Sequence, residues 1–430
     1  MNNNHLYIYS VKRNHRLNYI ISELVERRMG LEVDVVTNSD EFQNLTGPRL
    51  NYSDHKIQGV PHIFPAKLIF EKRVQEQDLD LNIGGLFRLY SSKANELGFD
   101  PFAAAFYFLS MYEEYLPHRE DVHGRFSFAE SVIVKHKVHQ LPLVEHYAIE
   151  LSKWLQKQFP ELKKIETSSS ICVTIDVDQL FAIKAKGLAR SILGFVADAF
   201  RSRLLSRIAV LSGRAPDPNE IYDKIIGLCQ SQNVPLTFFF QVGENSRFDI
   251  NNPPHLNEVK QRINELALSA DVGVHPSYYA SDDFDKTESE IERLRSILTT
   301  PVSKSRQHYL RYKLPKTYRY LSELGISEDF SVGFTDFNGF RASTCKPFRF
   351  FDLELDEITP ITIYPMCTMD ACSIKQYHNS EKALEEMISL KKAVEHVGGV
   401  MITTWHVEVM TAQTGSWPSY ELLEQFLAHE

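Results

Sequence analysis

The feature that most constrains the fold is an alternation of short apolar runs with amphipathic stretches, which begins near residue 171. The runs typical of strands are "ICVTIDVD", "PLTFFFQVG", "DVGVHPS", "SRQHYLRY", "EDFSVGF", "ITIYPM" and "GVMITTWHVE". Strands that alternate with helices predict parallel βα units with right-handed crossovers. About seven strands in about 265 residues, with polar residues at their carboxyl ends, favour a distorted (β/α)7-type barrel over an open sheet.

The first part of the chain has a different pattern. "HLYIYSV" and "LEVDVVT" are typical of strands and flank the helical stretch "RLNYIISELVERRMG", while the polar connector "PELKKIETSSS" follows a later helix. We therefore expect a smaller α/β or α+β domain of unknown function over residues 1–165 and the barrel domain over 166–430. Glu113 and Glu114 belong to a predicted buried helix. Adjacent helical residues do not face each other, so we expect structural roles for this pair.

The composition argues against several classes of protein. The chain of 430 residues has a net charge of −9 and a pI of about 6.0, which disfavours a general nucleic-acid or anionic-membrane surface. No segment has the roughly 18 uninterrupted apolar residues of a membrane helix, and the first residues do not resemble a signal peptide. The 5 cysteines are odd in number and lack CxxC spacing, which indicates reduced thiols in a cytoplasmic protein.

Two carboxylates close the first apolar run of the predicted barrel. Asp176 and Asp178 are two residues apart, so in a strand their side chains project from the same face. A single Asp at this position is often only a turn former or a helix cap. Two like charges on one face repel each other unless a cation or strong donors compensate them. A metal site, with one carboxylate as ligand and the other as base, explains the pair economically.

Histidines stand at the ends of three further runs. His275 ends one run and is followed by Ser277, Arg306 and His308 share one face of another, and His406 ends the last. A single histidine at a strand end is more often structural than a ligand. In a barrel, however, the carboxyl ends of the strands meet in one pocket, so the combination with the Asp pair favours a metal site.

The segments "TIDVD", "GVHPSYYAS", "SRQHYLRY", "EDFSVGFTDFNGFRASTCKPF" and "MITTWHVE" resemble, in order, the sequence blocks of the polysaccharide deacetylases. These are metal-dependent carbohydrate esterases that remove N- or O-acetyl groups from sugars. The resemblance covers about residues 170 to 410. It is strongest to a bacterial branch, found in surface-polysaccharide gene neighbourhoods, that has an extra N-terminal domain.

The resemblance implies roles for the residues of the first three blocks. Asp176 would be the general base, and Asp178 and His275 metal ligands. The family's second block usually holds two histidines four apart, but Tyr279 stands four residues after His275. His308 is the best replacement for the missing ligand, although a substrate-contacting or structural role for it stays open.

Other residues are assigned by the same resemblance. Arg306 would hold the catalytic carboxylate, unless it forms a plain surface salt bridge, and His406 would be the general acid. Trp405 would line the acetyl pocket or simply belong to the barrel core. The residues expected to contact substrate are Ser277, Tyr278, Tyr279, Arg341 and Trp405.

The expected activity is hydrolysis of an acetyl group from an N-acetylated sugar or polysaccharide. Zinc suits two imidazoles and a carboxylate, and cobalt, nickel or manganese would also fit. Three alternatives stay open: a hydrolase of other non-peptide C–N bonds on the same barrel, a catalytically idle sugar-binding relative, and a scaffold of a polysaccharide-assembly complex. No nucleic-acid partner is expected, and the sequence does not indicate an oligomeric state.

Overall fold

The computed structural model describes residues 4–82, 84–186, 204–377, 379–411 and 417–429. The chain divides into two compact units. The first comprises Met1–Ser169, Phe340–Ile363 and Lys392–Gly399, and the second comprises Ser170–Gly339, Tyr364–Lys391 and Val400–Glu430. The sequence predicted a continuous second domain, whereas two short segments of residues 166–430 group with the first unit.

The first unit contains a four-stranded parallel sheet in the order β2-β1-β3-β4. Its strands are β1 (His5–Tyr9), β2 (Glu32–Val36), β3 (Arg49–Tyr52) and β4 (His62–Ile63). The same unit holds an antiparallel pair, β10 (Phe348–Asp352) and β11 (Glu357–Ile363).

The helices of the first unit begin and end at recognisable signals. The helical stretch after β1 ends at Gly30, whose φ of 69° is left-handed and therefore suits glycine. Asp100 caps α4 by accepting the N–H groups of Phe102 and Ala103. The helical elements are α1 (His15–Ile20), a π-helix (Ile21–Glu26), α2 (Arg27–Met29), α3 (Ser39–Asn44), 3₁₀ turns (Lys67–Phe70, Tyr112–Tyr115, Phe128–Glu130), α4 (Pro101–Leu109), α5 (Val132–Lys135) and α6 (Leu143–Gln158).

The second unit is built on seven strands in the order β9-β8-β7-β6-β5-β13-β12. Strands β5 to β9 pair in parallel, as do β12 and β13. The strands are β5 (Ser169–Val177), β6 (Leu236–Phe240), β7 (Asp271–Val274), β8 (Lys304–Ser305), β9 (Glu328–Asp329), β12 (Met366–Met369) and β13 (Gly399–His406). The predicted fold class is thus confirmed: a distorted α/β barrel with a smaller α/β part.

The barrel closes through an irregular segment. The N–H of Met366, at the start of β12, donates to the carbonyl of Val332, which lies just after β9. A Cβ at Gly333 would lie 2.3 Å from Cγ of Met366, so only glycine allows this approach. The sheet therefore curls until its two ends meet, but within the described residues they do not pair as regular strands.

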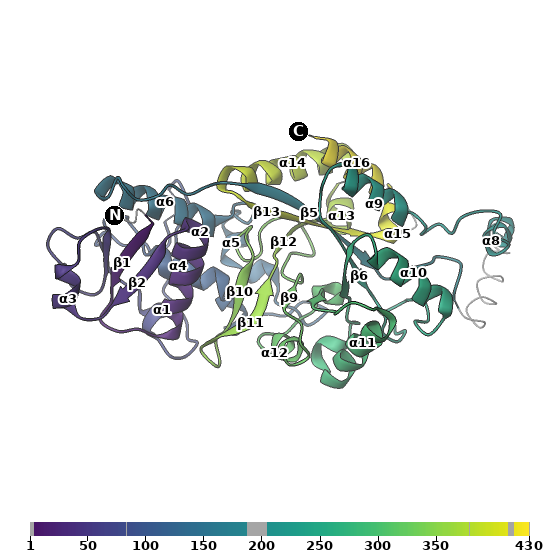
Figure 1. Ribbon diagram of the computed structural model, residues 1–430, viewed down its shortest axis with the longest axis horizontal. Coiled ribbons are helices and arrows are strands. Elements are labelled where there is room, and N and C mark those ends of the chain that lie inside the picture. The colour runs from purple at the N-terminus through teal and green to yellow at the C-terminus, as the bar shows by residue number, and fades with distance from the viewer. Residues whose placement is uncertain (1–3, 83, 187–203, 378, 412–416, 430) are drawn as a thin grey trace. The chain divides into compact units, whose positions relative to one another are not determined.

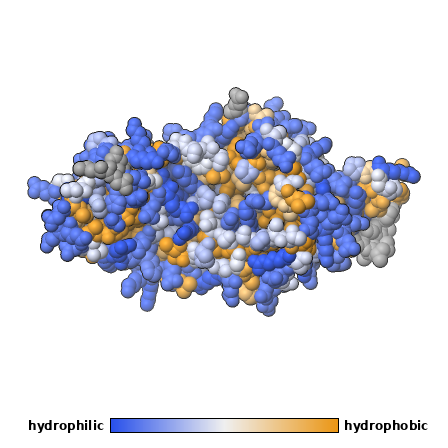
Figure 2. Space-filling model, in the orientation of Figure 1, coloured by the Kyte–Doolittle hydropathy of each residue, from blue (hydrophilic) through white to orange (hydrophobic). Residues whose placement is uncertain are grey.

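Helices cover the outside of this curled sheet, and α9 to α12 follow one another around the strands (Figure 1). The helical elements of the second unit are α8 (Leu204–Leu211), α9 (Tyr222–Ser231), α10 (Asn257–Ala267), 3₁₀ turns (Ala280–Asp282, His308–Leu310), α11 (Phe284–Ile297), α12 (Lys316–Glu323), α13 (Asp370–Gln376), α14 (Ser380–Val397, which ends in the first unit), α15 (Val407–Met410) and α16 (Tyr420–Ala428). Hydrophilic residues cover much of the surface in Figure 2. None of the described helices combines the length and apolarity needed to cross a membrane.

Candidate metal centre and active site

Strand register brings the predicted residues to one edge of the barrel. Val177, Phe240, Val274 and Ser305 form one row across β5, β6, β7 and β8. The next residue along each chain segment therefore points to the same side: Asp178, Gln241, His275 and Arg306. Strand β8 ends at Ser305, so Arg306 and His308 lie just after the strand rather than inside it as predicted.

Three of these side chains form a group that could hold a metal ion. One ligand atom from each of Asp178, His275 and His308 lies within 4.8 Å of the other two. Nε2 of His275 is 3.3 Å from Oδ1 of Asp178, and Nε2 of His308 is 3.6 Å from Oδ2. These are the three residues that the sequence predicted as ligands, with His308 in place of the missing second-block histidine.

The hydrogen bonds of His275 indicate what the group binds. Its Nδ1 is 2.6 Å from the carbonyl oxygen of Arg306, which can only accept, so Nδ1 carries a hydrogen. Nε2 then presents a lone pair to Oδ1 of Asp178, and neither atom has a hydrogen-bond partner among the described residues. An imidazolium would instead donate to this oxygen, but 3.3 Å exceeds the usual length of about 2.7–2.9 Å for such a bond. Two facing acceptors fit a divalent cation between them.

His308, the third residue of this group, is oriented by a buried carboxylate that the sequence analysis did not single out. Oδ1 of Asp249 lies 2.8 Å from Nδ1 of His308, which directs Nε2 toward Asp178. Asp249 is 1% exposed, and it also accepts hydrogen bonds from the N–H of Tyr278 and the hydroxyl of Ser246. One carboxylate thus joins the segments that follow β6, β7 and β8.

In the absence of a cation, His308 and the neighbouring carboxylates stabilise each other's charged forms. Burial lowers the pKa of His308, but Asp178 and Asp249 outweigh burial and raise it to about 9. Burial also raises the pKa of Asp178, but the positive charge of His308 outweighs burial and holds this pKa well below its usual range. Without a cation, His308 is therefore protonated near neutral pH, and a metal ion bound at its Nε2 should release this proton.

Asp249→Asn is expected to weaken zinc binding roughly 10- to 100-fold, because the amide loses the charge that orients and polarises His308. The matched control is Asp329→Asn. Asp329 is also a buried carboxylate of this unit, but it accepts hydrogen bonds from Ser305, Ser331 and Tyr318. Competition with a chelator measures both dissociation constants. Equal weakening in the two variants would show a general effect of lost buried charge and contradict the assignment.

Asp176 lies beside this group and is held by Arg306. Nη1 of Arg306 is 2.9 Å from Oδ1 of Asp176, while its Nε donates to the carbonyl of Phe330 and its guanidinium lies 4.7 Å from the ring of Phe239. Arg306 is 0% exposed, so the alternative of a surface salt bridge does not apply. The other oxygen of Asp176 faces Nε2 of His406 at 3.8 Å and Nε2 of His275 at 3.9 Å.

His406 stands across from Asp176 and has its own carboxylate partner, Asp370. Oδ1 of Asp370 is 2.7 Å from Nδ1 of His406, and Oδ2 accepts the backbone N–H of His406 and the hydroxyl of Ser419. Burial lowers the pKa of His406, but Asp370 outweighs it and raises the pKa to about 10. Sequence analysis missed Asp370 although its signal was present, because it directly follows the apolar run "MCTM" of β12.

Glu408 is a third carboxylate that the sequence analysis did not single out. It accepts the backbone N–H of Gln179, the residue after Asp178, at 3.0 Å. Burial and the negative charge of Asp178 raise the pKa of Glu408 to about 7. Through this hydrogen bond, Glu408 fixes the backbone at the start of the segment that follows β5.

Two of the predicted substrate residues, Ser277 and Trp405, make hydrogen bonds within the fold. The N–H and hydroxyl of Ser277 both donate to Glu290, so this serine fixes the turn after His275. Trp405 is buried and its Nε1 donates to Thr403, as expected of a barrel-core residue.

The remaining predicted substrate residues divide between the two units. Tyr278 is buried and Tyr279 is exposed, and both follow His275 in the second unit. Arg341 belongs to the first unit, where Nη2 lies 2.6 Å from Oε1 of Glu114 and Nη1 4.0 Å from Glu113. Glu113 and Glu114 thus take part in internal ion pairing within that unit.

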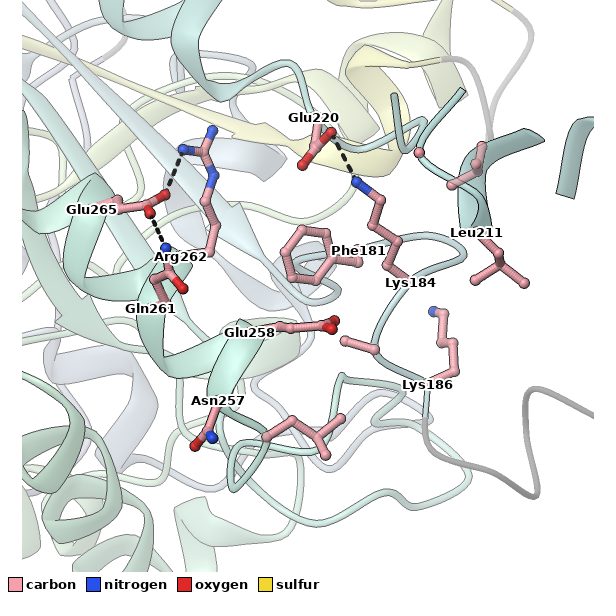
Figure 3. A pocket seen from close by; sticks show the side chains of 14 residues that line it. Phe181, Lys184, Lys186, Leu211, Glu220, Asn257, Glu258, Gln261, Arg262 and Glu265 are labelled. Carbon is pink, nitrogen blue, oxygen red and sulfur yellow. Dashed lines mark hydrogen bonds and ion pairs between the residues drawn. The ribbon is translucent and has the colours of Figure 1, made fainter. Parts of the chain in front are cut away.

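A separate cavity of about 730 Å³ lies in the second unit (Figure 3). Its lining includes Phe181 and the two ion pairs Lys184–Glu220 and Arg262–Glu265. It contains none of the predicted site residues. Its paired charges do not suggest a reaction centre.

Comparisons with known proteins give partial matches. Residues 6–160 match a family of unknown function, DUF7033, and no curated protein matches the chain. Several solved structures are similar, and three of them are named here. One is a provisionally assigned polysaccharide deacetylase from Mycobacterium smegmatis, with 16% identity, a TM-score of 0.39, and coverage of 61% of this chain and 83% of that chain. Another, from Bordetella bronchiseptica, is described as a provisionally assigned polysaccharide deacetylase involved in O-antigen biosynthesis, with 16% identity, a TM-score of 0.31, and coverage of 60% of this chain and 80% of that chain. The third is described as a probable polysaccharide deacetylase from Pseudomonas aeruginosa, with 12% identity, a TM-score of 0.37, and coverage of 60% of this chain and 83% of that chain. The descriptions of these three structures name polysaccharide deacetylases, the family that the sequence blocks resemble.

Proposed function

We propose that the chain is a metal-dependent deacetylase that hydrolyses the acetyl group of an N-acetylated saccharide. The observation that carries the proposal is the pair of facing acceptors, Nε2 of His275 and Oδ1 of Asp178, beside a third imidazole and a separate carboxylate. A cation is the economical way to satisfy this arrangement.

The residues that would hold the cation are Asp178, His275 and His308. One carboxylate and two imidazoles suit zinc, and leave coordination positions for water and substrate. When bound, a divalent cation supplies Lewis-acid activation of water and of an acyl oxygen. Cobalt, nickel and manganese are the other candidates for this donor set.

Asp176 is placed to accept the proton of the attacking water. Arg306 binds one of its oxygens, which holds the carboxylate in position and leaves the other oxygen facing the space between His275 and His406. Asp176 can therefore serve as the general base without being a ligand.

His406 is placed to donate a proton to the departing amine. Its Nε2 faces the site while Nδ1 is bound by Asp370, and its pKa of about 10 keeps it protonated near neutral pH. An amine is a poor leaving group unless it is protonated as it departs. Attack on the acetyl carbonyl and proton donation by His406 give acetate and a free amino sugar.

Acetate release tests this function directly. The metal-stripped chain and the zinc-loaded chain are assayed over a panel of N-acetylated monosaccharides and oligosaccharides, in parallel with other non-peptide C–N substrates such as formamides and cyclic ureides. Acetate release that depends on zinc supports the proposal. Turnover confined to the other substrates favours the alternative hydrolase, and zinc binding without any turnover favours the idle or scaffold alternative.

Asp370→Asn is expected to move the pH dependence of deacetylation. Burial lowers the pKa of His406 and Asp370 is the largest cause that raises it, so the variant's pKa should fall toward its ordinary range. Because the protonated imidazole is the donor, the rate declines as pH rises through this pKa, and the decline should begin at lower pH in the variant. A pH–rate profile of the same shape but reduced height would instead assign Asp370 a purely structural role.

A further inference from the structure

Gln241 is a polar residue in an otherwise apolar position, directly after strand β6. All 5 residues of β6 are buried, and Gln241 itself is 5% exposed. Its N–H donates to the carbonyl of Val177, and the N–H of His275 donates to the carbonyl of Phe240, so the parallel pairing continues for one residue on each side. The side chain of Gln241 therefore lies between those of Asp178 and His275 in the row at the edge of the barrel.

Asp249 fixes the orientation of the Gln241 amide. Nε2 of Gln241 is 3.1 Å from Oδ1 of Asp249 and 2.9 Å from Nδ1 of His308. An ionised carboxylate oxygen can only accept a hydrogen bond, so the nitrogen end of the amide faces Asp249. The oxygen end, Oε1, is left for another partner.

The nitrogen end does not by itself explain a glutamine at this position. Oδ1 of Asp249 already accepts hydrogen bonds of 2.8 Å from Nδ1 of His308 and from the N–H of Tyr278. Nε2 of Gln241 adds a third and longer bond to the same oxygen. What glutamine contributes that these donors do not is its oxygen.

Oε1 of Gln241 is buried and accepts no hydrogen bond from any residue that the structure describes. Buried amide oxygens are normally hydrogen-bonded, so this one requires a partner. Its neighbours in the row are in the same condition, because Oδ1 of Asp178 and Nε2 of His275 also lack one among the described residues. The segments at the ends of β5, β6 and β7 thus each present one buried acceptor.

A single divalent cation would satisfy these acceptors together, whereas a hydrogen-bond donor would satisfy only one of them. Amide oxygens are ordinary ligands of divalent cations that prefer oxygen, such as manganese and calcium. A neutral ligand also suits this position in the row. Asp178 and Asp249 already place two negative charges beside Gln241, and a third carboxylate would repel both.

We propose that Gln241 is a fourth ligand of the cation, bound through Oε1, in addition to Asp178, His275 and His308. The proposal rests on the metal centre of the proposed function. The ligand set then comprises two oxygens and two imidazole nitrogens. Each added oxygen ligand favours manganese more than zinc, so the site should discriminate less against manganese than a site of three ligands would.

The test measures the dissociation constants of Mn²⁺ and Zn²⁺ for the parent and for Gln241→Leu, by competition with a chelator. Leucine is close to glutamine in size but offers no oxygen. Loss of a residue that only orients a ligand typically weakens metal binding 10- to 100-fold, so loss of a ligand should weaken manganese binding by at least about 10-fold. Zinc binding should weaken less, so the ratio of the manganese to the zinc dissociation constant should rise.

Gln241→Glu separates a ligand from a residue that merely positions Asp249. Glutamate keeps an oxygen at the place of Oε1 but replaces Nε2 by an oxygen that faces the carboxylate of Asp249. If Oε1 binds the cation, this variant should bind manganese at least about 10-fold more tightly than Gln241→Leu. If Gln241 acts only through Nε2, both variants lose the same donor and glutamate adds repulsion, so binding no tighter than in Gln241→Leu would overturn the proposal.

Gln307→Leu is the matched control for loss of a buried amide. Gln307 is 1% exposed, and neither its Oε1 nor its Nε2 has a partner in the part of the chain that the structure describes. It precedes His308 in the chain but makes no hydrogen bond to Asp249 there. This variant should bind both metals as the parent does, and equal weakening in Gln307→Leu and Gln241→Leu would contradict the assignment.

The outcomes distinguish this ligand from the rest of the proposed function. A parent that binds neither metal overturns the metal centre and Gln241 together. A parent that binds metal, with parental affinities in Gln241→Leu, overturns the role of Gln241 alone and leaves the deacetylase proposal intact. If the leucine variant does not fold, Gln241→Met takes its place, because it keeps an unbranched side chain without the oxygen and should show the same rise in the ratio.

Discussion

Asp178→Asn is expected to abolish the stabilisation of the protein by zinc. A ligand that binds only the folded chain stabilises it by about 2.7 kcal/mol at 100 times its dissociation constant, and the parent should show a gain of this size. The variant should show none, because a neutral amide is a poor ligand for a divalent cation. Its metal-free form should remain folded, since the amide N–H can donate to the unpartnered Nε2 of His275.

Thermal unfolding with and without zinc measures this difference. Asp176→Asn is the matched control, because it removes the neighbouring carboxylate from the same strand face and should keep the zinc effect. An Asp178→Asn protein that zinc stabilises as strongly as the parent would remove Asp178 from the ligand set.

Asp176→Asn is expected to lower turnover by about 10²–10⁴-fold while metal binding is retained, which is the second large effect. An amide cannot accept the proton of water, but its oxygen can still accept the hydrogen bond from Nη1 of Arg306. Asparagine is preferable to alanine here, because alanine would leave the buried guanidinium unpaired at a cost of about 3–5 kcal/mol.

Single-turnover acetate release and zinc content, measured on the same preparation, check the second prediction. Loss of both zinc and turnover in Asp176→Asn, combined with retention of both in Asp178→Asn, would reverse the roles of the two carboxylates. A retained zinc content and a parental rate in Asp176→Asn would assign the general base to another group.

The sequence predicted the barrel and its polar edge because both depend on local periodicity. The run before Asp176 and Asp178 is apolar enough to require burial, and strand alternation alone puts the two carboxylates on one face. His275 was found by the same rule. His308 was found only through its spacing from Arg306, and the structure places it in a 3₁₀ turn after β8 rather than in a strand.

The positioning residues could not all be predicted. Asp370 directly follows an apolar run, so the rule that identified Asp176, Asp178 and His275, a polar residue at the end of a strand, could have identified it too. Asp249 stands in the polar loop "GENSRFDINN", where aspartate is common and where nothing local indicates that the carboxylate turns inward to His308.

The division of the chain into two units could not be predicted fully from local sequence patterns. Residues 340–363 lie between the barrel strands β9 and β12 in the chain, and the sequence assigned them to the barrel domain, but they group with the first unit. Compactness depends on contacts between distant segments, such as the hydrogen bond from Val144 N–H to the carbonyl of Ser343. The boundary near residue 165 stays a prediction that limited proteolysis can test.

The central claim is that Asp178, His275 and His308 hold one catalytic cation, and metal titration of the stripped chain tests it most directly. Calorimetric titration with zinc should give one site per chain, with release of a proton as the cation displaces the proton of His308. A chain that takes up no zinc, cobalt, nickel or manganese, or that binds zinc equally well after His275→Ala and His308→Ala, would contradict the claim.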